Sequence, residues 1–208
     1  MTTWTRLLIF AFGCAALTVW ADGNLLRNPS FEERIPDSER RAQYWTMHHP
    51  DAYGDTFGSA SREDWRSFDG LFIMAIRGLW ANAGHYGGVW QESAAEPGET
   101  YKASARFWAD PDWEAATQEI KLEFWTADYN ELLATKSTVL RRVGPDWRQY
   151  TVQAKAPEGA ERVRLVIFAE GAGEYGALQF DHTYLSTLDE YQEPEAHPVS
   201  MIIDILEE

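Results

Sequence analysis

The sequence predicts an all-β fold, a sandwich or a barrel, and three observations lead to that expectation. Apolar and polar residues alternate in short segments, as they do in strands with one buried face. Gly, Pro, Asp and Asn, which favour turns, separate these segments. No long stretch has the 3.6-residue period of an amphipathic helix, and about nine strand-like segments at this spacing are typical of a sandwich or barrel.

Each segment has the length of a single strand. The segments are residues 43–48, 71–77, 88–93, 100–108, 119–126, 135–141, 148–154, 162–170 and 177–186. Only residues 113–119 and 199–208 are candidates for short helices. The 208 residues are enough for one domain with a sizeable core, and no internal repeat is present.

The composition is acidic, with 18 Lys and Arg residues against 33 Asp and Glu residues and a formal net charge of −15. Binding to nucleic acid or to anionic lipid headgroups depends on clustered basic residues, so the charge argues against both partners. Aromatic residues make up 14% of the chain, and ten residues are Trp. A core of this size needs fewer rings, so we expect some of them to have a role beyond the core.

Residues 1–21 are typical of a secretory signal peptide. An apolar run at residues 7–17, too short to span a bilayer, is followed by small residues around Ala21, where cleavage would leave Asp22 as the first residue. Cleavage would remove Cys14, the one cysteine, so no disulfide would stabilise the mature chain, and we expect no membrane insertion of it. The protein would be secreted to the periplasm or the extracellular space. Anchoring as a lipoprotein at Cys14 is the alternative.

The C-terminal part, residues 187–208, is expected to be a tail outside the domain at residues 22–186. Residues 187–198 are acidic and contain Pro194 and Pro198, which indicates exposure. A short apolar segment follows at residues 201–206. We expect it to dock back on the sandwich, and the alternative is that it binds a protein partner or a second copy of the chain.

Six phrases in a fixed order carry a resemblance to a known family. They are NLLRNPSFE at residues 24–32, GGVWQE at 87–92, PGETYKASA at 97–105, WRQYT at 147–151, APEGA at 156–160 and GALQFD at 176–181. Together they resemble the jelly-roll carbohydrate-binding modules of families 4, 9, 16 and 22, which are of galactose-binding-like type. The resemblance implies a two-sheet antiparallel jelly-roll β-sandwich that binds a polysaccharide or oligosaccharide and has no catalytic activity.

Two successive strand segments carry a large ring on their polar side. Residues 100–108 place Arg106 and Trp108 opposite the apolar face, and residues 119–126 do the same with Glu123 and Trp125. If these strands pair, the four side chains form one surface of flat rings and hydrogen-bonding groups. That surface suits a sugar, whose C–H face packs on a ring while its hydroxyls need donors and acceptors. For the two tryptophans, a covered second face is the alternative.

Other rings are assigned by their position in the chain. The candidate carbohydrate-binding residues are Trp80, Arg106, Trp108, Trp113, Glu123 and Trp125, because Trp80 and Trp113 lie in turn-rich segments where a ring can form one side of a cleft. The parity of Trp90 makes it a candidate for the same face. Five rings match positions that are structural in the family and are expected in the core: Phe31, Trp45, Tyr101, Trp147 and Phe180.

The resemblance also implies a structural calcium ion between the first and last strands. Its ligands would come from Ser30, Glu32 and Asp181, and hard oxygen ligands from both chain ends would clamp the sandwich shut. His182 replaces the second aspartate of the family pattern. The alternative is that Glu32 and Asp181 are hydrogen-bonded carboxylates at the edge of a sheet.

Catalytic motifs are absent from the sequence. Residues 171–176 spell G-x-G-x-x-G, but they lie between two strand segments, where a dinucleotide site needs a helix N-terminus, so we expect a loop. The sequence therefore predicts a secreted, non-catalytic module that recognises a polysaccharide through exposed aromatic and polar side chains. The alternatives are an extracellular structural or adhesive sandwich and a small glycan-active hydrolase or lyase.

Overall fold

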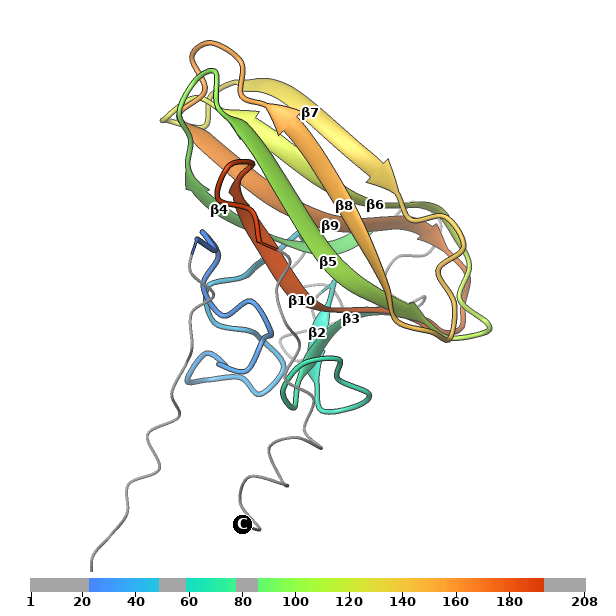
Figure 1. Ribbon diagram of the computed structural model, residues 1–208. Coiled ribbons are helices and arrows are strands. Elements are labelled where there is room, and N and C mark those ends of the chain that lie inside the picture. The colour runs from blue at the N-terminus through green and yellow to red at the C-terminus, as the bar shows by residue number, and fades with distance from the viewer. Residues whose placement is uncertain (1–22, 49–58, 78–85, 193–208) are drawn as a thin grey trace, which may run out of the picture.

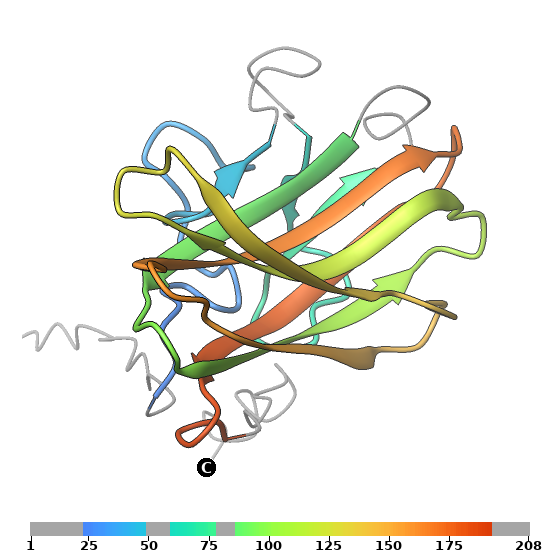
Figure 2. The same ribbon diagram turned by 90° about the horizontal axis from the view of Figure 1, so that it is seen from above.

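The computed structural model describes residues 23–48, 59–77 and 86–192, which fold into two antiparallel sheets of five strands each. The sheets are the two layers of a β-sandwich, as predicted (Figures 1 and 2). The described part of the chain contains no helix, and hence none that could cross a membrane. The helix considered for residues 113–119 is wrong, because residues 115–119 begin a long strand. Residues 1–21, Trp80 and residues 199–208 lie outside the described ranges.

The first sheet has the strand order β1-β4-β9-β6-β7. Its strands are β1 (Thr46–Met47), β4 (Tyr86–Ala94), β9 (Arg162–Ala172), β6 (Ala115–Trp125) and β7 (Leu132–Val139). In the register of the central strand β9, Arg164 stands opposite Glu92 of β4 and Glu123 of β6. Three charged side chains from three strands therefore meet in one row.

The second sheet has the strand order β2-β3-β10-β5-β8. Its strands are β2 (Ser61–Glu63), β3 (Ile73–Arg77), β10 (Ala177–Thr187), β5 (Thr100–Ala109) and β8 (Arg148–Lys155). The successive strands β5 and β6 belong to different sheets, because residues 110–114 cross from one layer to the other. The condition for a joint surface, that residues 100–108 pair with residues 119–126, is therefore not met: β5 pairs with β10 and β8, and β6 pairs with β9 and β7.

Alternate side chains of both sheets form the core between the layers. Ile120, Leu122 and Phe124 of β6 and Ala103, Ala105 and Phe107 of β5 are fully buried in one cluster. Burial of a side chain such as Leu or Phe contributes about 1.5–3 kcal/mol, so the alternation read from the sequence is also what stabilises the fold.

The rings expected in the core lie there, with one exception. Phe31, Trp45, Tyr101 and Phe180 are buried members of the core cluster. Trp147 is partly exposed and packs on the outside of the sandwich, with its ring centroid 5.8 Å from that of Phe68.

β10 is buried along almost its whole length, on its outer side as well as on its core side. The N-terminal segment, residues 23–32, runs beside β10. The N–H of Leu25 donates to the carbonyl of Leu185 at 2.8 Å, and the N–H of Thr183 donates to the carbonyl of Pro29 at 2.9 Å. A bulge interrupts β10 between residues 181 and 184, where His182 has a φ of 54°. This bulge turns the backbone towards the N-terminal segment.

The described chain enters and leaves the sandwich at neighbouring points. A Cβ added to Gly23 would lie 3.3 Å from the carbonyl oxygen of Glu190. Tyr191 then holds the end of the chain on β5, because its hydroxyl donates to Ser104 Oγ at 3.0 Å and the Lys102 ammonium lies 3.8 Å from its ring centroid.

Candidate functional site

Six side chains on the outer face of the first sheet form one cluster, which we call the aromatic platform. They are Trp90 and Glu92 of β4, Glu123 and Trp125 of β6, Tyr129 of the turn after β6, and Arg164 of β9. The strand residues alternate with core residues such as Phe124, so they point away from the core. All six are at least partly exposed.

The guanidinium of Arg164 lies at the centre of the platform. Its Cζ is 3.7 Å from the ring centroid of Trp90, 5.1 Å from that of Trp125 and 5.7 Å from that of Tyr129. Its Nη2 lies 3.2 Å from Glu92 Oε2, and its Nη1 lies 3.8 Å from Glu123 Oε2. The side chain is only 15% exposed, and a partly desolvated cation–π contact is worth about 1–2 kcal/mol. Arg164 therefore fixes the two indoles on opposite sides of β9.

The two carboxylates of the platform orient the remaining polar groups. Glu123 Oε2 accepts the indole N–H of Trp125 at 3.1 Å, and the hydroxyl of Tyr129 donates to Glu92. Partial burial and this hydrogen bond raise the pKa of Tyr129 above its usual value, so the hydroxyl remains a donor at neutral pH. Each ring of the platform thus has a charged or hydrogen-bonded neighbour that holds it in place.

The apolar surface continues along β9 towards Phe168. The ring centroids of Phe168 and Tyr86 are 5.3 Å apart, and the Lys121 ammonium lies 4.2 Å from the Phe168 centroid. Val166 lies between Arg164 and Phe168 and is fully buried beneath its neighbours. Phe168 lies four residue steps along β9 from Arg164, which is about 13 Å. The face therefore carries rings at two places along β9.

The predicted binding residues are divided between the two faces of the sandwich. Glu123 and Trp125 belong to the platform, but Arg106 and Trp108 lie on the outer face of the second sheet, since β5 is part of that sheet. Trp108 is only 4% exposed, because the guanidinium of Arg66 covers its ring at 4.4 Å from the centroid. The expected single surface of four side chains does not form.

Trp113 is part of the core and does not line a cleft. It is 8% exposed, and its indole N–H donates to Gln118 Oε1 at 2.7 Å. Gly176 packs directly on it, since a Cβ at Gly176 would approach the backbone N of Trp113 to 2.7 Å. The remaining residue of the predicted set, Trp80, is not among the residues that the structure describes.

Three platform residues are missing from the sequence-based prediction: Glu92, Tyr129 and Arg164. A signal exists for Arg164, because the run Arg-Val-Arg-Leu at residues 162–165 places both arginines on the outer face. The parity of Trp90 likewise indicates that face. What no pattern reveals is that β9 lies between β4 and β6, and that order is what brings Trp90, Arg164 and Trp125 together.

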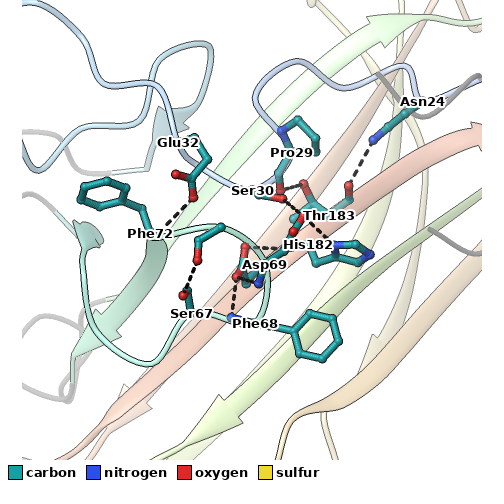
Figure 3. Close-up of polar contacts among 12 residues, drawn as sticks. Asn24, Pro29, Ser30, Glu32, Ser67, Phe68, Asp69, Phe72, His182 and Thr183 are labelled. Carbon is teal, nitrogen blue, oxygen red and sulfur yellow. Dashed lines mark hydrogen bonds and ion pairs between the residues drawn. The ribbon is translucent and has the colours of Figure 1, made fainter. Parts of the chain in front are cut away.

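The residues expected to bind calcium lie where the N-terminal segment meets β10, and the carboxylates of Glu32 and Asp181 accept hydrogen bonds from backbone N–H groups. Figure 3 shows Ser30 and Glu32 in this region. Asp181 Oδ2 accepts the backbone N–H groups of Phe68 and Asp69, each at 2.8 Å. Glu32 Oε1 accepts those of residues 71 and 72 at 2.9 and 3.0 Å. The hydroxyl of Ser30 donates to Asp69 Oδ2 at 2.6 Å.

The carboxylate oxygens that the resemblance assigns to calcium therefore already have hydrogen-bond partners in the protein. Calcium takes about six to eight oxygen ligands. In the described ranges no group of three or more His, Cys, Asp and Glu side chains is arranged to hold a metal ion. Burial raises the pKa of Asp181 well above its usual value, although hydrogen bonds from the backbone N–H groups of Phe68, Asp69 and His182 oppose this effect.

No protein-family model matches the sequence, and no curated protein matches it significantly. Solved structures do have a similar fold. The carbohydrate-binding module TmCBM61, solved in complex with beta-1,4-galactotriose, matches with a TM-score of 0.52 and 16% identity over 79% of this chain and 98% of its own. A cyclase from Fischerella sp. TAU, solved in complex with 4-(1H-indol-3-yl)butan-2-one, matches with a TM-score of 0.55 and 15% identity over 85% of this chain and 100% of its own.

A third similar structure is the enzymatically active domain of tailspike protein 4 of bacteriophage CBA120, with a TM-score of 0.56 and 13% identity over 79% of this chain. This chain spans only 21% of that one. Identities this low show the fold alone, and the similar structures include both a binding module and enzymes. The chain has a two-layer β-sandwich fold that is similar to that of the carbohydrate-binding module TmCBM61.

Proposed function

We propose that the protein is a secreted, non-catalytic carbohydrate-binding module whose binding site is the aromatic platform. One observation carries this proposal: Trp90 and Trp125 lie on opposite sides of Arg164 on one outer face, with a carboxylate beside each. The similarity of the fold to TmCBM61 supports it.

The platform offers both kinds of contact that a sugar needs. The C–H faces of pyranose rings pack on the indoles, while Glu92 and Glu123 accept hydrogen bonds from hydroxyls and Arg164 donates to them. Arg164 already holds the rings before the ligand arrives. Binding therefore avoids much of the cost of about 0.5–1.5 kcal/mol for each side chain that would otherwise have to be ordered.

Binding through one such face serves a tethering role. If the module is joined to a second binding or catalytic unit, it holds that unit close to the polymer. The effective concentration of the second unit at the polymer is then raised. Moderate affinity is enough for this purpose.

Substitution of the platform tryptophans tests the site. Trp90→Ala and Trp125→Ala should each weaken binding to the preferred glycan at least tenfold, which is a loss of about 1.4 kcal/mol. Depletion by insoluble polysaccharides and calorimetry with soluble ones, over a panel of neutral glycans, measure this effect.

Trp65 provides the matched control, since it is 44% exposed but belongs to the connection between β2 and β3, which covers the second sheet. Trp65→Ala should bind as the wild type does. If Trp65→Ala loses binding while the platform variants keep it, the site is on the other face. If no glycan of the panel binds, the proposed function is wrong.

The absence of catalysis is tested separately, because the fold also occurs in enzymes. We expect no release of reducing ends or unsaturated products from any glycan that the protein binds. Turnover that disappears in Glu92→Gln or Glu123→Gln would make the platform the active site of a glycan-active enzyme.

Secretion and assembly have their own readouts. Protein recovered outside the cytoplasm should have the mass of a chain that begins at Asp22. If residues 199–208 instead join copies of the chain, their deletion should convert an oligomer into a monomer in light-scattering measurements.

A further inference from the structure

The connection between β2 and β3, residues 64–72, closes the outer face of the second sheet, and we call it the β2–β3 loop. The guanidinium of Arg66 lies 4.4 Å from the ring centroid of Trp108. Phe68 packs against Trp147, and the Arg106 guanidinium lies 4.8 Å from the centroid of the Phe68 ring. The loop therefore lies against the two residues, Arg106 and Trp108, that had been expected to face a sugar.

Asp181 of β10 holds the first half of this loop. Its Oδ2 accepts the N–H groups of Phe68 and Asp69 at 2.8 Å each, and its Oδ1 accepts the N–H of His182 at 2.7 Å. The residue is 0% exposed. Three backbone donors thus surround a carboxyl group that is closed off from water.

Glu32 of the N-terminal segment holds the second half. Its Oε1 accepts the N–H groups of Leu71 and Phe72 at 2.9 and 3.0 Å. Gly70 makes room for this carboxylate, because a Cβ at Gly70 would lie 2.3 Å from Glu32 Oε1. Its φ of +66° is also one that other residues rarely adopt. The glycine is needed for both reasons.

Asp69, in the middle of the loop, joins the same two segments. Its Oδ2 accepts the hydroxyl of Ser30 at 2.6 Å and lies 3.0 Å from Nδ1 of His182 (Figure 3). One residue of the N-terminal segment and one residue of β10 therefore contact a single oxygen of the loop.

We propose that the β2–β3 loop takes the place of a structural calcium ion, so that backbone N–H groups join the N-terminal segment to β10 and the fold requires no metal there. N–H dipoles bring positive charge to the oxygens of Glu32 and Asp181, as a cation would. A calcium ion bound to Glu32 Oε1 and to the two oxygens of Asp181 would compete with five such donors, those of residues 68, 69, 71, 72 and 182. This inference is independent of the proposed sugar binding.

Thermal unfolding of the full chain in excess calcium chloride and in EDTA tests the metal. We expect the two Tm values to agree within about 1 °C, whereas a specific ion well above its Kd would raise Tm by several degrees. A rise that Asp181→Asn abolishes would overturn the proposal. A rise that Asp181→Asn retains would come from another part of the chain and would leave these carboxylates without calcium, as proposed.

A pair of glycine variants tests the loop. Gly98→Ala is the matched control for Gly70→Ala, because Gly98 also has a positive φ, +88°, but a Cβ there meets no atom within 4 Å. Gly70→Ala should lower Tm by several degrees more than Gly98→Ala does. In a Glu32→Ala background this difference should vanish, because the displaced carboxylate is gone. Equal Tm values for the two glycine variants in the wild-type background would overturn the proposal.

Glu32→Gln keeps the test decisive if Gly70→Ala does not fold. Its amide oxygen can still accept the N–H groups of Leu71 and Phe72, so its Tm should stay within a few degrees of the wild type in both calcium and EDTA. A large loss of Tm that calcium partly restores would instead identify Glu32 as a metal ligand.

Discussion

Arg164 is the residue on which the geometry of the platform depends. It contacts two indoles and two carboxylates, which come from the strands on either side of β9. Arg164→Ala leaves Glu92 and Glu123 with their charges unbalanced and should lower the free energy of unfolding by about 1–3 kcal/mol.

The variant Arg164→Lys tests the positive charge of this side chain separately from its planar shape. Lysine retains the positive charge but not the flat guanidinium, so it should preserve most of the stability while weakening glycan binding about tenfold. Calorimetry and chemical denaturation on the same samples measure the two effects. Arg148→Ala, at an exposed position of β8, is the control and should change neither. Wild-type affinity in Arg164→Lys would mean that the planar contact is unimportant.

Tyr129 gives the platform a pH dependence in the alkaline range. Its folded-state pKa is raised by partial burial and by the hydrogen bond to Glu92, so its stabilising contribution is complete below about pH 10 and is lost as the pH rises beyond that. The difference in ultraviolet absorbance between wild type and Tyr129→Phe should therefore show one phenol that ionises above pH 10. A difference titration at or below pH 10 would contradict the contact with Glu92.

At the scale of the element, the pairing of β4 with β9 tolerates almost no change. Gly88 has a φ of +150°, and a Cβ there would lie 2.1 Å from the carbonyl oxygen of Ile167 in β9. Gly88→Ala should force the strands apart and destabilise the fold by more than about 3 kcal/mol, or prevent folding. Gly144→Ala, with no atom within 4 Å, should unfold at the wild-type Tm. Near wild-type stability in Gly88→Ala would disprove this register.

The elements also show how far alternation can be read. Alternation gives the bounds of β5, β9 and β10 closely, although β10 is buried on both faces, and it gives only the second part of β6. It missed β2, which has only three residues, Ser61–Glu63, and no apolar alternation. It also makes residues 113–119 a candidate helix, although β6 begins at Ala115, because the small and polar residues there carry no period.

The platform could be predicted only in part. Parity gave the outward direction of Glu123 and Trp125, but which strands become neighbours depends on contacts distant in sequence. Successive strands pair in most proteins, whereas residues 110–114 here carry the chain from the second sheet to the first. This crossover places Trp108 and Trp125 on different sheets. The indole that shares Arg164 with Trp125 is therefore Trp90, not Trp108.

At the scale of the whole molecule, the net charge of −15 limits which polymers can approach. A polyanion such as polygalacturonate is repelled at low ionic strength, where screening is weak. We expect no depletion by acidic polysaccharides in buffers of low salt, and little effect of salt on binding to neutral ones. Tight binding to an acidic polysaccharide that salt weakens would show that local basic groups outweigh the overall charge.

The proximity of Gly23 and Glu190 has a practical consequence. Neighbours in a longer polypeptide, or tags fused before residue 23 and after residue 192, would leave from the same corner of the molecule. The sandwich could therefore be inserted into a loop of a host protein without a large separation of the two ends of that loop. Immobilisation through either terminus should also present the module to a glycan in the same orientation.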